Sequence, residues 1–285
     1  MNRPTTNAFG YPICEIHELF EDAELEATIK RIGSRVFAHL EIIDAERIVD
    51  ECIGFAKRFK NVFEYEKAAH QMLEREGVTQ KIPEKLTGRA DLIYSQIAPY
   101  LVGGSVLDLG CGDAKVGERL AQDGREVHVA DVYKHPHVDE TGLPFSELNQ
   151  KGTLPYPDNH FDNVLVLTVA HHSDDPQKVL AEAHRVAKPG GRVIVIESVF
   201  DVEDYLDIPR EQQFKVNMFF DHFYNRVIHY SEDPDQKVNV PFNFNTPTGW
   251  ADEYERIGLK RVDFMPLAVD QEAVPEFHFL DVMEK

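Results

Sequence analysis

One stretch, residues 105–114 with the sequence Ser-Val-Leu-Asp-Leu-Gly-Cys-Gly-Asp-Ala, constrains the fold of this chain more than any other. Its first residues, 106–109, predict a short buried strand that runs directly into Gly110 and Gly112. A helix over about residues 115–122 follows. Glycines between a strand and a helix let the backbone approach a ligand closely, and the first helical turn offers N–H groups without intrahelical partners. The stretch therefore predicts an α/β fold with a ligand at this turn.

Two acidic residues end the first two predicted strands. Asp108 ends the first strand and would direct its carboxylate toward the glycine turn. A second strand, over residues 126–130, ends on Asp131, about twenty residues further on, where a carboxylate can accept hydrogen bonds from two ribose hydroxyls. A Gly-x-Gly pair alone is weak evidence for a ligand site. Together with two acids at strand ends, it predicts a ligand that contains a nucleoside.

Residues 106–112, Val-Leu-Asp-Leu-Gly-Cys-Gly, resemble the first motif of class I S-adenosylmethionine (SAM) dependent methyltransferases. Residues 154–162, Leu-Pro-Tyr-Pro-Asp-Asn-His-Phe-Asp, and 185–191, Arg-Val-Ala-Lys-Pro-Gly-Gly, resemble the segments that lead into strands four and five of that family. The resemblance covers about residues 85–200. It implies a Rossmann-like, seven-stranded, doubly wound α/β sheet that binds SAM.

The resemblance also implies individual cofactor contacts. Arg89, on the helix before the first strand, could pair with the SAM carboxylate, and Val132 would contact adenine or ribose through its backbone. The chain departs from the family at Ala114, where a third glycine is commoner, and at Asn149–Gln150, where an acid usually binds the adenine amino group. A carboxamide oxygen can still accept that hydrogen bond. The predicted cofactor-binding set is Arg89, Asp108, Gly110, Cys111, Gly112, Asp131, Val132, Gln150, Leu154 and Thr168.

A second chemical site is predicted where the fourth strand, residues 163–168, ends. Ligands bind outside the carboxyl ends of the strands in open α/β sheets, so residues 168–174 should face the same crevice. His171 and His172 are adjacent and cannot both point the same way. One is a candidate general base and the other a loop-packing residue, and a role as pocket wall for both stays open. Glu197 ends the fifth strand at the same edge.

Residues 200–250 leave the family's shared pattern and carry an aromatic helix. Class I methyltransferases usually place their substrate lid in this slot, between strands five and six. The stripe of aromatic side chains could equally be core packing. The predicted substrate-binding set is Glu197, Phe219, His222, Phe223 and Tyr224.

Apolar residues at helical spacing predict a helical cap over residues 1–85, with the methyltransferase domain at 86–285 and a lid at 200–250. Asp44 is a predicted helix N-cap, and Asn61 with Glu64 reads as a capping box. Pro83 is expected to separate the cap from a helix that starts near Thr87. His135 and His137 flank a proline, but no third ligand follows at a fitting spacing, so no metal site is predicted.

Charge narrows the substrate class. Residues 101–285 hold 33 acidic and 17 basic residues, within a net charge of −20 for the whole chain. An enzyme that acts on nucleic acid needs a basic stripe for the phosphates, and the one basic cluster here, residues 57–60, reads as a solvated helix face. We therefore expect a neutral or cationic small molecule and no nucleic-acid partner.

Cysteines and hydropathy indicate the compartment. Cys14, Cys52 and Cys111 have no metal-like spacing, and no run of about eighteen apolar residues occurs. The N-terminus lacks the apolar core of a signal peptide. We expect a cytoplasmic protein without a membrane partner, and a homodimer is an open possibility.

The sequence thus predicts a SAM-dependent methyltransferase that transfers methyl to an oxygen, nitrogen, sulfur or carbon atom of a small molecule. One alternative is a protein or RNA methyltransferase, and another is a non-catalytic, regulatory SAM-binding protein. A close resemblance to the quinone-biosynthesis methyltransferases is not expected, because their Arg-Asn pair after strand four is here His171–His172.

Overall fold

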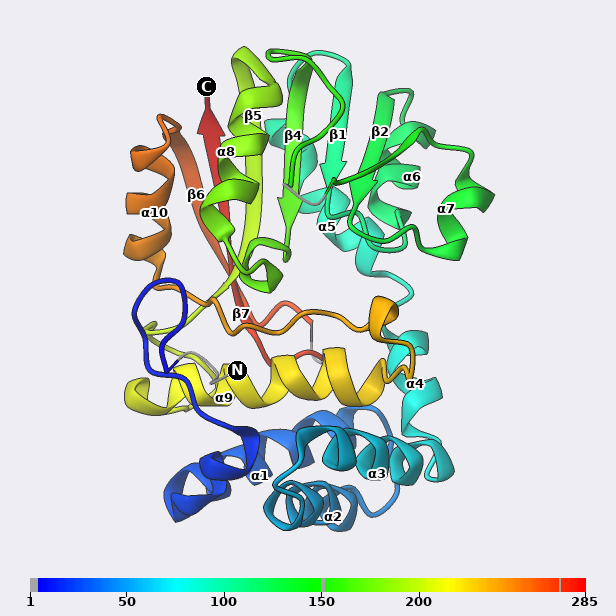
Figure 1. Ribbon diagram of the computed structural model, residues 1–285, viewed down its shortest axis with the longest axis vertical. Coiled ribbons are helices and arrows are strands. Elements are labelled where there is room, and N and C mark those ends of the chain that lie inside the picture. The colour runs from blue at the N-terminus through cyan, green and yellow to red at the C-terminus, as the bar shows by residue number, and fades with distance from the viewer. Residues whose placement is uncertain (1–4, 150–151, 272) are drawn as a thin grey trace. The chain divides into compact units, whose positions relative to one another are not determined.

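The computed structural model describes residues 5–149, 152–271 and 273–285 (Figure 1). The chain divides into two compact units. The first contains Met1–Thr87, Val199–Phe244 and Ala268–Phe277, and the second contains Gly88–Ser198, Asn245–Leu267 and His278–Lys285. The insert after the fifth strand therefore belongs to the same unit as the N-terminal helices. The predicted division into a cap, a catalytic domain and a lid stays a prediction.

In the described part of the chain, seven strands form one sheet in the order β3-β2-β1-β4-β5-β7-β6. The first five run parallel to their neighbours, as the register Val106↔Asn163 shows for β1 and β4. At the other side, the Gly190 N–H donates to the Lys285 carbonyl at 2.9 Å, so the start of β5 meets the end of β7. The last strand is thus antiparallel to β5, and its arrow opposes those of β1 and β4 in Figure 1. The strands are β1 Ser105–Leu109, β2 Glu126–Asp131, β3 Phe145–Glu147, β4 Phe161–Leu167, β5 Ala187–Val199, β6 Lys260–Ala268 and β7 Phe277–Glu284.

Helices cover both faces of this sheet. Ile97 of α5 and Leu120 of α6 share one apolar cluster with Val129 and Ile194 of the strands, and all four are fully buried. Leu180 of α8 is also buried but lies outside that cluster, and Figure 1 shows α8 in front of the sheet and α5 behind it. The sheet is therefore doubly wound, as predicted. Its helices are α5 Arg89–Ile97, α6 Lys115–Gln122, α7 Pro136–Thr141, α8 Pro176–Val186 and α10 Pro247–Arg256, with short 3₁₀ turns at Ala98–Tyr100 and Ala170–His172.

Local chemistry explains where these helices begin. The Asp175 side chain accepts the Lys178 N–H at 3.2 Å and Pro176 opens α8, so capping and a fixed φ act together. Thr246 caps α10 in the same way, through the Gly249 N–H at 3.0 Å. Before α6, Ala114 adopts a left-handed φ of +60°, which explains why a glycine is commoner there in the family.

In the first unit, α9 packs against the N-terminal helices. Phe219 lies edge-on to Phe20 with ring centroids 5.6 Å apart, and Phe223 contacts Phe37 at 6.0 Å. Core packing therefore accounts for the aromatic stripe, while a substrate contact by these rings stays a prediction. The helices are a 3₁₀ turn Ile16–Glu21, α1 Ala23–His39, α2 Ala45–Arg58, α3 Val62–Arg75, α4 Val78–Lys85 and α9 Arg210–His222, followed by a π-helical turn Phe223–Ile228 and a 3₁₀ turn Pro234–Gln236.

One local expectation for this unit was wrong. No break occurs at Pro83, because α4 runs through it, and the burial of Val78 and Ile82 outweighs the hydrogen bond that a proline removes. Asp44 is the N-cap residue of α2, as predicted, but it takes a left-handed φ of +58° and its side chain makes no cap bond. Asn61 does cap α3, by accepting the Phe63 N–H at 3.0 Å. None of the helices in the described part of the chain has the length and apolar character needed to cross a bilayer.

Candidate functional site

The glycine turn after β1 is held against the end of β2. The N–H groups of Gly110 and Cys111 donate to the Ala130 carbonyl at 2.7 and 3.1 Å. Gly110 has a left-handed φ of +80°, and a Cβ built there would lie 2.4 Å from the Val169 side chain. A Cβ on Gly112 would meet no atom within 4 Å. The turn is thus closed on the Gly110 side and open in front of Gly112, where a ligand can approach the backbone.

Asp131, at the end of β2, binds this turn directly. Its Oδ2 accepts the Gly112 N–H at 2.8 Å and its Oδ1 accepts the Val132 N–H at 2.7 Å. Burial raises the pKa of the carboxyl group, and these N–H contacts oppose that rise. Each carboxylate oxygen keeps a further lone pair for a hydroxyl. The Val132 side chain is 72% exposed, so the backbone of this residue is the part that the turn positions.

Asp108 occupies a different environment, although it also ends a strand. Only 3% of it is exposed, and burial together with the neighbouring Asp131 charge raises the pKa of its carboxyl group to about 7. The Gly117 N–H in the first turn of α6 bonds to Asp108 and partly opposes this rise. A Cβ on Gly117 would lie 2.8 Å from Val129, so the glycine allows α6 to pack closely on β2.

The structure brings Arg89 and Thr168 together at the end of β4. Arg89 is the first residue of α5, and its Nη2 donates to Thr168 Oγ1 at 3.1 Å. Thr168 has a left-handed φ of +56°, and its N–H donates to the Ile196 carbonyl at 2.6 Å. A cation therefore lies at the turn that follows β4, as a SAM carboxylate would require.

Leu154 is buried, with 3% of its surface exposed, and its N–H donates to Glu182 Oε1 at 2.6 Å. Leu148, at the end of β3, donates its N–H to the Asp131 carbonyl at 3.0 Å. The segment before Leu154 thus starts beside Asp131. Gln150, the predicted adenine contact, lies outside the described residues.

Glu197 anchors the turn that carries the two histidines. Its Oε1 accepts the N–H groups of Val169 and Ala170 at 3.0 and 2.6 Å, and its Oε2 lies 2.5 Å from His171 Nδ1. Glu197 and His171 are 1% and 2% exposed, and the His171 and His172 rings lie 4.0 Å apart. A carboxylate on Nδ1 fixes the tautomer and the orientation of an imidazole.

This positioning role of Glu197 was missed in the sequence, where it was assigned to the substrate. The available signal was an acid at the end of β5, one strand away from a His-His pair at the end of β4. Both carboxylate oxygens accept hydrogen bonds from the protein itself.

The other predicted substrate residues lie in the first unit. His222 Nε2 is 3.1 Å from Glu66 Oε1, and its ring stacks on Tyr65 at 5.7 Å. The Tyr224 hydroxyl donates to the Ala273 carbonyl. Phe219 and Phe223 are 4% and 3% exposed. The meeting of this segment with the ends of β4 and β5 stays a prediction.

The paired loop histidines have local roles. His135 precedes α7 and caps it, since its Nδ1 accepts the His137 N–H at 3.2 Å. His137 Nδ1 lies 3.0 Å from Glu140.

Comparison with known proteins identifies the sheet unit. Residues 107–195 match the family described as "Methyltransferase domain". These residues are similar to a methyltransferase domain, the family that the sequence motifs resemble. Among curated relatives of the methyltransferase domain, the ubiquinone biosynthesis O-methyltransferase of Stutzerimonas stutzeri is 29% identical over 140 residues, which are 46% of this chain and 60% of that protein. The Proteus mirabilis protein of that name is 32% identical over 105 residues, 34% of this chain and 42% of its own length.

The chain thus spans less than two thirds of these relatives. Both relatives are named for quinone biosynthesis. The sequence, with His171–His172 after strand four, predicted no close resemblance to that group.

Two solved structures share the fold of the methyltransferase domain. A SAM-dependent methyltransferase from Methanosarcina mazei aligns with a TM-score of 0.52 and 18% identity, over 67% of this chain and 97% of its own. Geranyl diphosphate methyltransferase in complex with SAM aligns with a TM-score of 0.51 and 14% identity, over 73% and 90%. At these identities the likeness concerns the fold alone. For the domain, the predicted family resemblance and fold class are confirmed, whereas the enzyme class and the SAM cofactor are proposals.

Proposed function

We propose that the protein transfers a methyl group from SAM to a small molecule. The observation that carries this proposal is the contact between Asp131 and the Gly112 N–H, 2.8 Å long. It places an acid suited to the ribose hydroxyls at the open side of the glycine turn, where backbone N–H groups reach a ligand. The match to a methyltransferase domain supports the same assignment.

The residues at the strand ends fit the parts of SAM. Asp131 would accept the ribose hydroxyls, the backbone of Gly110–Gly112 would lie along the methionine half, and Arg89 would pair with the carboxylate. When bound, SAM supplies a methyl group already activated by a sulfonium. The protein's task is then to hold the accepting atom in line with that methyl in a dry pocket.

We propose that His171 removes a proton from the accepting atom when the substrate arrives protonated. Glu197 holds the His171 Nδ1 side at 2.5 Å, which assigns the proton chemistry to Nε2. Glu197 acts here as a positioning residue. The predicted contact of Glu197 with the substrate is less well supported, because its oxygens already serve Val169, Ala170 and His171.

A small hydroxylated molecule is the proposed substrate class. The excess of acidic residues over basic ones disfavours nucleic acid and favours a neutral or cationic molecule. The matched relatives are named O-methyltransferases, so oxygen is the first accepting atom to test. No disulfide joins Cys14, Cys52 and Cys111, which fits a reducing compartment, and we propose the cytoplasm.

Calorimetry with SAM and with its product, S-adenosylhomocysteine, tests the cofactor site in the wild type and in Asp131→Ala. Glu126→Gln is the matched control, because this acid starts the same strand, β2, at the end away from the glycine turn. Mass spectrometry of hydroxylated small molecules incubated with SAM then tests transfer. Absence of binding to either nucleoside by the folded wild type would refute the proposal, and binding without any transfer would favour a regulatory protein.

A further inference from the structure

The described residues that follow β3 contact Asp131 through Leu148 and helix α8 through Leu154. The segment begins at Leu148, whose N–H donates to the Asp131 carbonyl at 3.0 Å. Asn149 accepts the Thr153 N–H on its Oδ1 at 3.0 Å. The next residue, Leu154, is one of the predicted cofactor contacts and is buried. The position of Leu154 relative to Asp131 therefore depends on what holds its own backbone.

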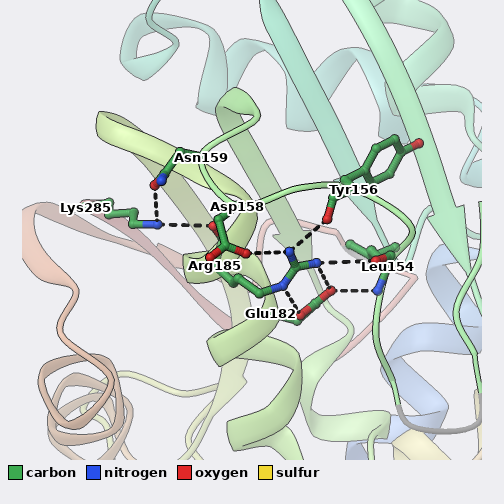
Figure 2. A network of polar contacts seen from close by, with 7 residues as sticks. All are labelled: Leu154, Tyr156, Asp158, Asn159, Glu182, Arg185 and Lys285. Carbon is green, nitrogen blue, oxygen red and sulfur yellow. Dashed lines mark hydrogen bonds and ion pairs between the residues drawn. The ribbon is translucent and has the colours of Figure 1, made fainter.

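Arg185 and Glu182, both on α8, bond to the carbonyl and to the N–H of Leu154 (Figure 2). Glu182 Oε1 accepts the Leu154 N–H at 2.6 Å, and Arg185 Nη2 donates to the Leu154 carbonyl at 3.3 Å. Arg185 Nη1 reaches the Tyr156 carbonyl at 2.8 Å and Asp158 Oδ1 at 2.9 Å. We call Glu182 and Arg185 the clamp.

The two side chains of the clamp also fix each other. Arg185 Nε and Nη2 bond to the two oxygens of Glu182 at 2.8 and 2.6 Å, a bidentate pair. Glu182 is 9% exposed and Arg185 28%. A lysine carries the same charge but lacks the planar fork, so it cannot bind Glu182 and the two carbonyls together.

Main-chain bonds hold the following residues independently of the clamp. The Asn159 N–H donates to the Arg185 carbonyl at 3.0 Å, and the His160 N–H donates to the Val186 carbonyl at 2.7 Å. Lys285 Nζ bonds to the Arg185 carbonyl at 3.1 Å and to Asn159 at 2.8 Å. Because these bonds use backbone atoms of α8, substitution of the Arg185 side chain leaves the entry into β4 attached.

We propose that the clamp positions Leu154 for the nucleoside half of SAM, an inference that rests on the proposed function. Leu148 is bonded to the Asp131 carbonyl and Leu154 is bonded to the clamp, so Asp131 fixes the backbone of Leu148 and the clamp fixes that of Leu154. Without the clamp, the ligand itself would have to order Leu154 on binding, which costs affinity. Arg185 and Glu182 touch no substrate and act through Leu154.

Arg185→Lys is the decisive variant, measured by calorimetry with S-adenosylhomocysteine and with 5′-methylthioadenosine, which lacks the amino-acid half. We expect both ligands to bind about tenfold more weakly, because the loss falls on the nucleoside. The KM for SAM should rise by a similar factor while kcat at saturating SAM stays within about twofold. Arg192→Lys is the control, since it makes the same exchange of side chain at an ion pair with Glu284, between β5 and β7.

Glu182→Gln provides a second route if Arg185→Lys folds poorly. It weakens the bidentate pair, and its effect should not add to that of Arg185→Lys, because both act through Leu154. Unchanged binding of both nucleosides by folded Arg185→Lys and Glu182→Gln, next to a binding wild type, would overturn the clamp. A loss confined to S-adenosylhomocysteine would overturn it as well. A wild type that binds neither nucleoside would instead refute the proposed function.

Discussion

The turns after β1 and β4 are held by the same device, an acid at the end of the neighbouring strand. Asp131 of β2 holds the turn after β1 through the Gly112 N–H, and Glu197 of β5 holds the turn after β4 through the N–H groups of Val169 and Ala170. The difference lies in burial. Glu197 is 1% exposed, whereas Asp131 stands beside an open space at Gly112.

This difference assigns distinct tasks to two chemically similar groups. An acid that is accessible beside backbone donors can accept a ligand, and a buried acid that also binds an imidazole can only orient it. We call the turn after β1, with Asp131, the β1 edge, and the turn after β4, with Glu197, the β4 edge. We therefore expect substitutions at the β1 edge to change cofactor binding and substitutions at the β4 edge to change the transfer step.

The largest expected effect is on turnover at the β4 edge. His171→Ala should lower kcat by about a hundredfold or more while the affinity for S-adenosylhomocysteine holds, because a positioned general base contributes that much. Steady-state kinetics with an identified acceptor measures it. His172→Ala is the matched comparison and should act mainly on the KM for the acceptor. Equal, small effects of both variants would make the two imidazoles pocket walls.

Cofactor affinity should respond at the other edge. Asp131→Ala should weaken SAM binding by roughly 2–3 kcal/mol, the value of charged hydrogen bonds to a ligand. Glu197→Gln should leave that affinity nearly unchanged and lower kcat. Calorimetry on both variants checks the contrast. If Glu197→Gln weakened SAM binding as much as Asp131→Ala, the proposed division of tasks would be wrong.

Local signals explain why the β1 edge could be predicted from the sequence. The helix at 115–122, the strand ending on Asp131 and the glycine turn are each specified by neighbouring residues, and α6 and β2 occur at those positions. A left-handed φ costs glycine the least, and the sequence shows Gly110 and Gly112 at this turn.

The β4 edge depended on contacts that sequence spacing does not show. The bond from Glu197 to His171 requires β4 and β5 to pair in the register Leu167↔Ile196, which places the two strand ends together. The aromatic helix carries the same ambiguity, because periodicity predicts a buried face without saying whether a core or a ligand covers it. Pro83 was misjudged for a similar reason, since the tertiary burial of α4 overrides a local signal.

A smaller expected effect, on the free energy of unfolding, separates backbone strain from packing at the glycine turn. Gly110→Ala and Gly124→Ala both force alanine to a left-handed φ, +80° and +82°. At Gly110 the new Cβ would also lie 2.4 Å from Val169, whereas at Gly124 nothing lies within 4 Å. Gly110→Ala should therefore lower the free energy of unfolding by at least about 1 kcal/mol more than Gly124→Ala. Chemical denaturation of both variants tests this, and equal losses would mean that Val169 moves aside.

The last prediction concerns Asp108, a strand-end acid that is as buried as Glu197 but lies beside another acid instead of an imidazole. Its pKa is about 7 in the folded protein, against a model-peptide value of 3.8, because burial and the Asp131 charge disfavour the carboxylate. Between these two values the folded state binds more protons than the unfolded state, so the free energy of unfolding falls as the pH rises. The slope from this group is at most about 1.4 kcal/mol per pH unit.

Asp108→Asn removes this titration and should flatten the decline in stability of the protein as the pH rises through that window. Denaturant unfolding at a series of pH values measures the two slopes. Glu126→Gln, at the exposed start of β2, should leave the wild-type slope unchanged. Parallel curves for the wild type and Asp108→Asn would show that folding does not shift the pKa of the Asp108 carboxyl group.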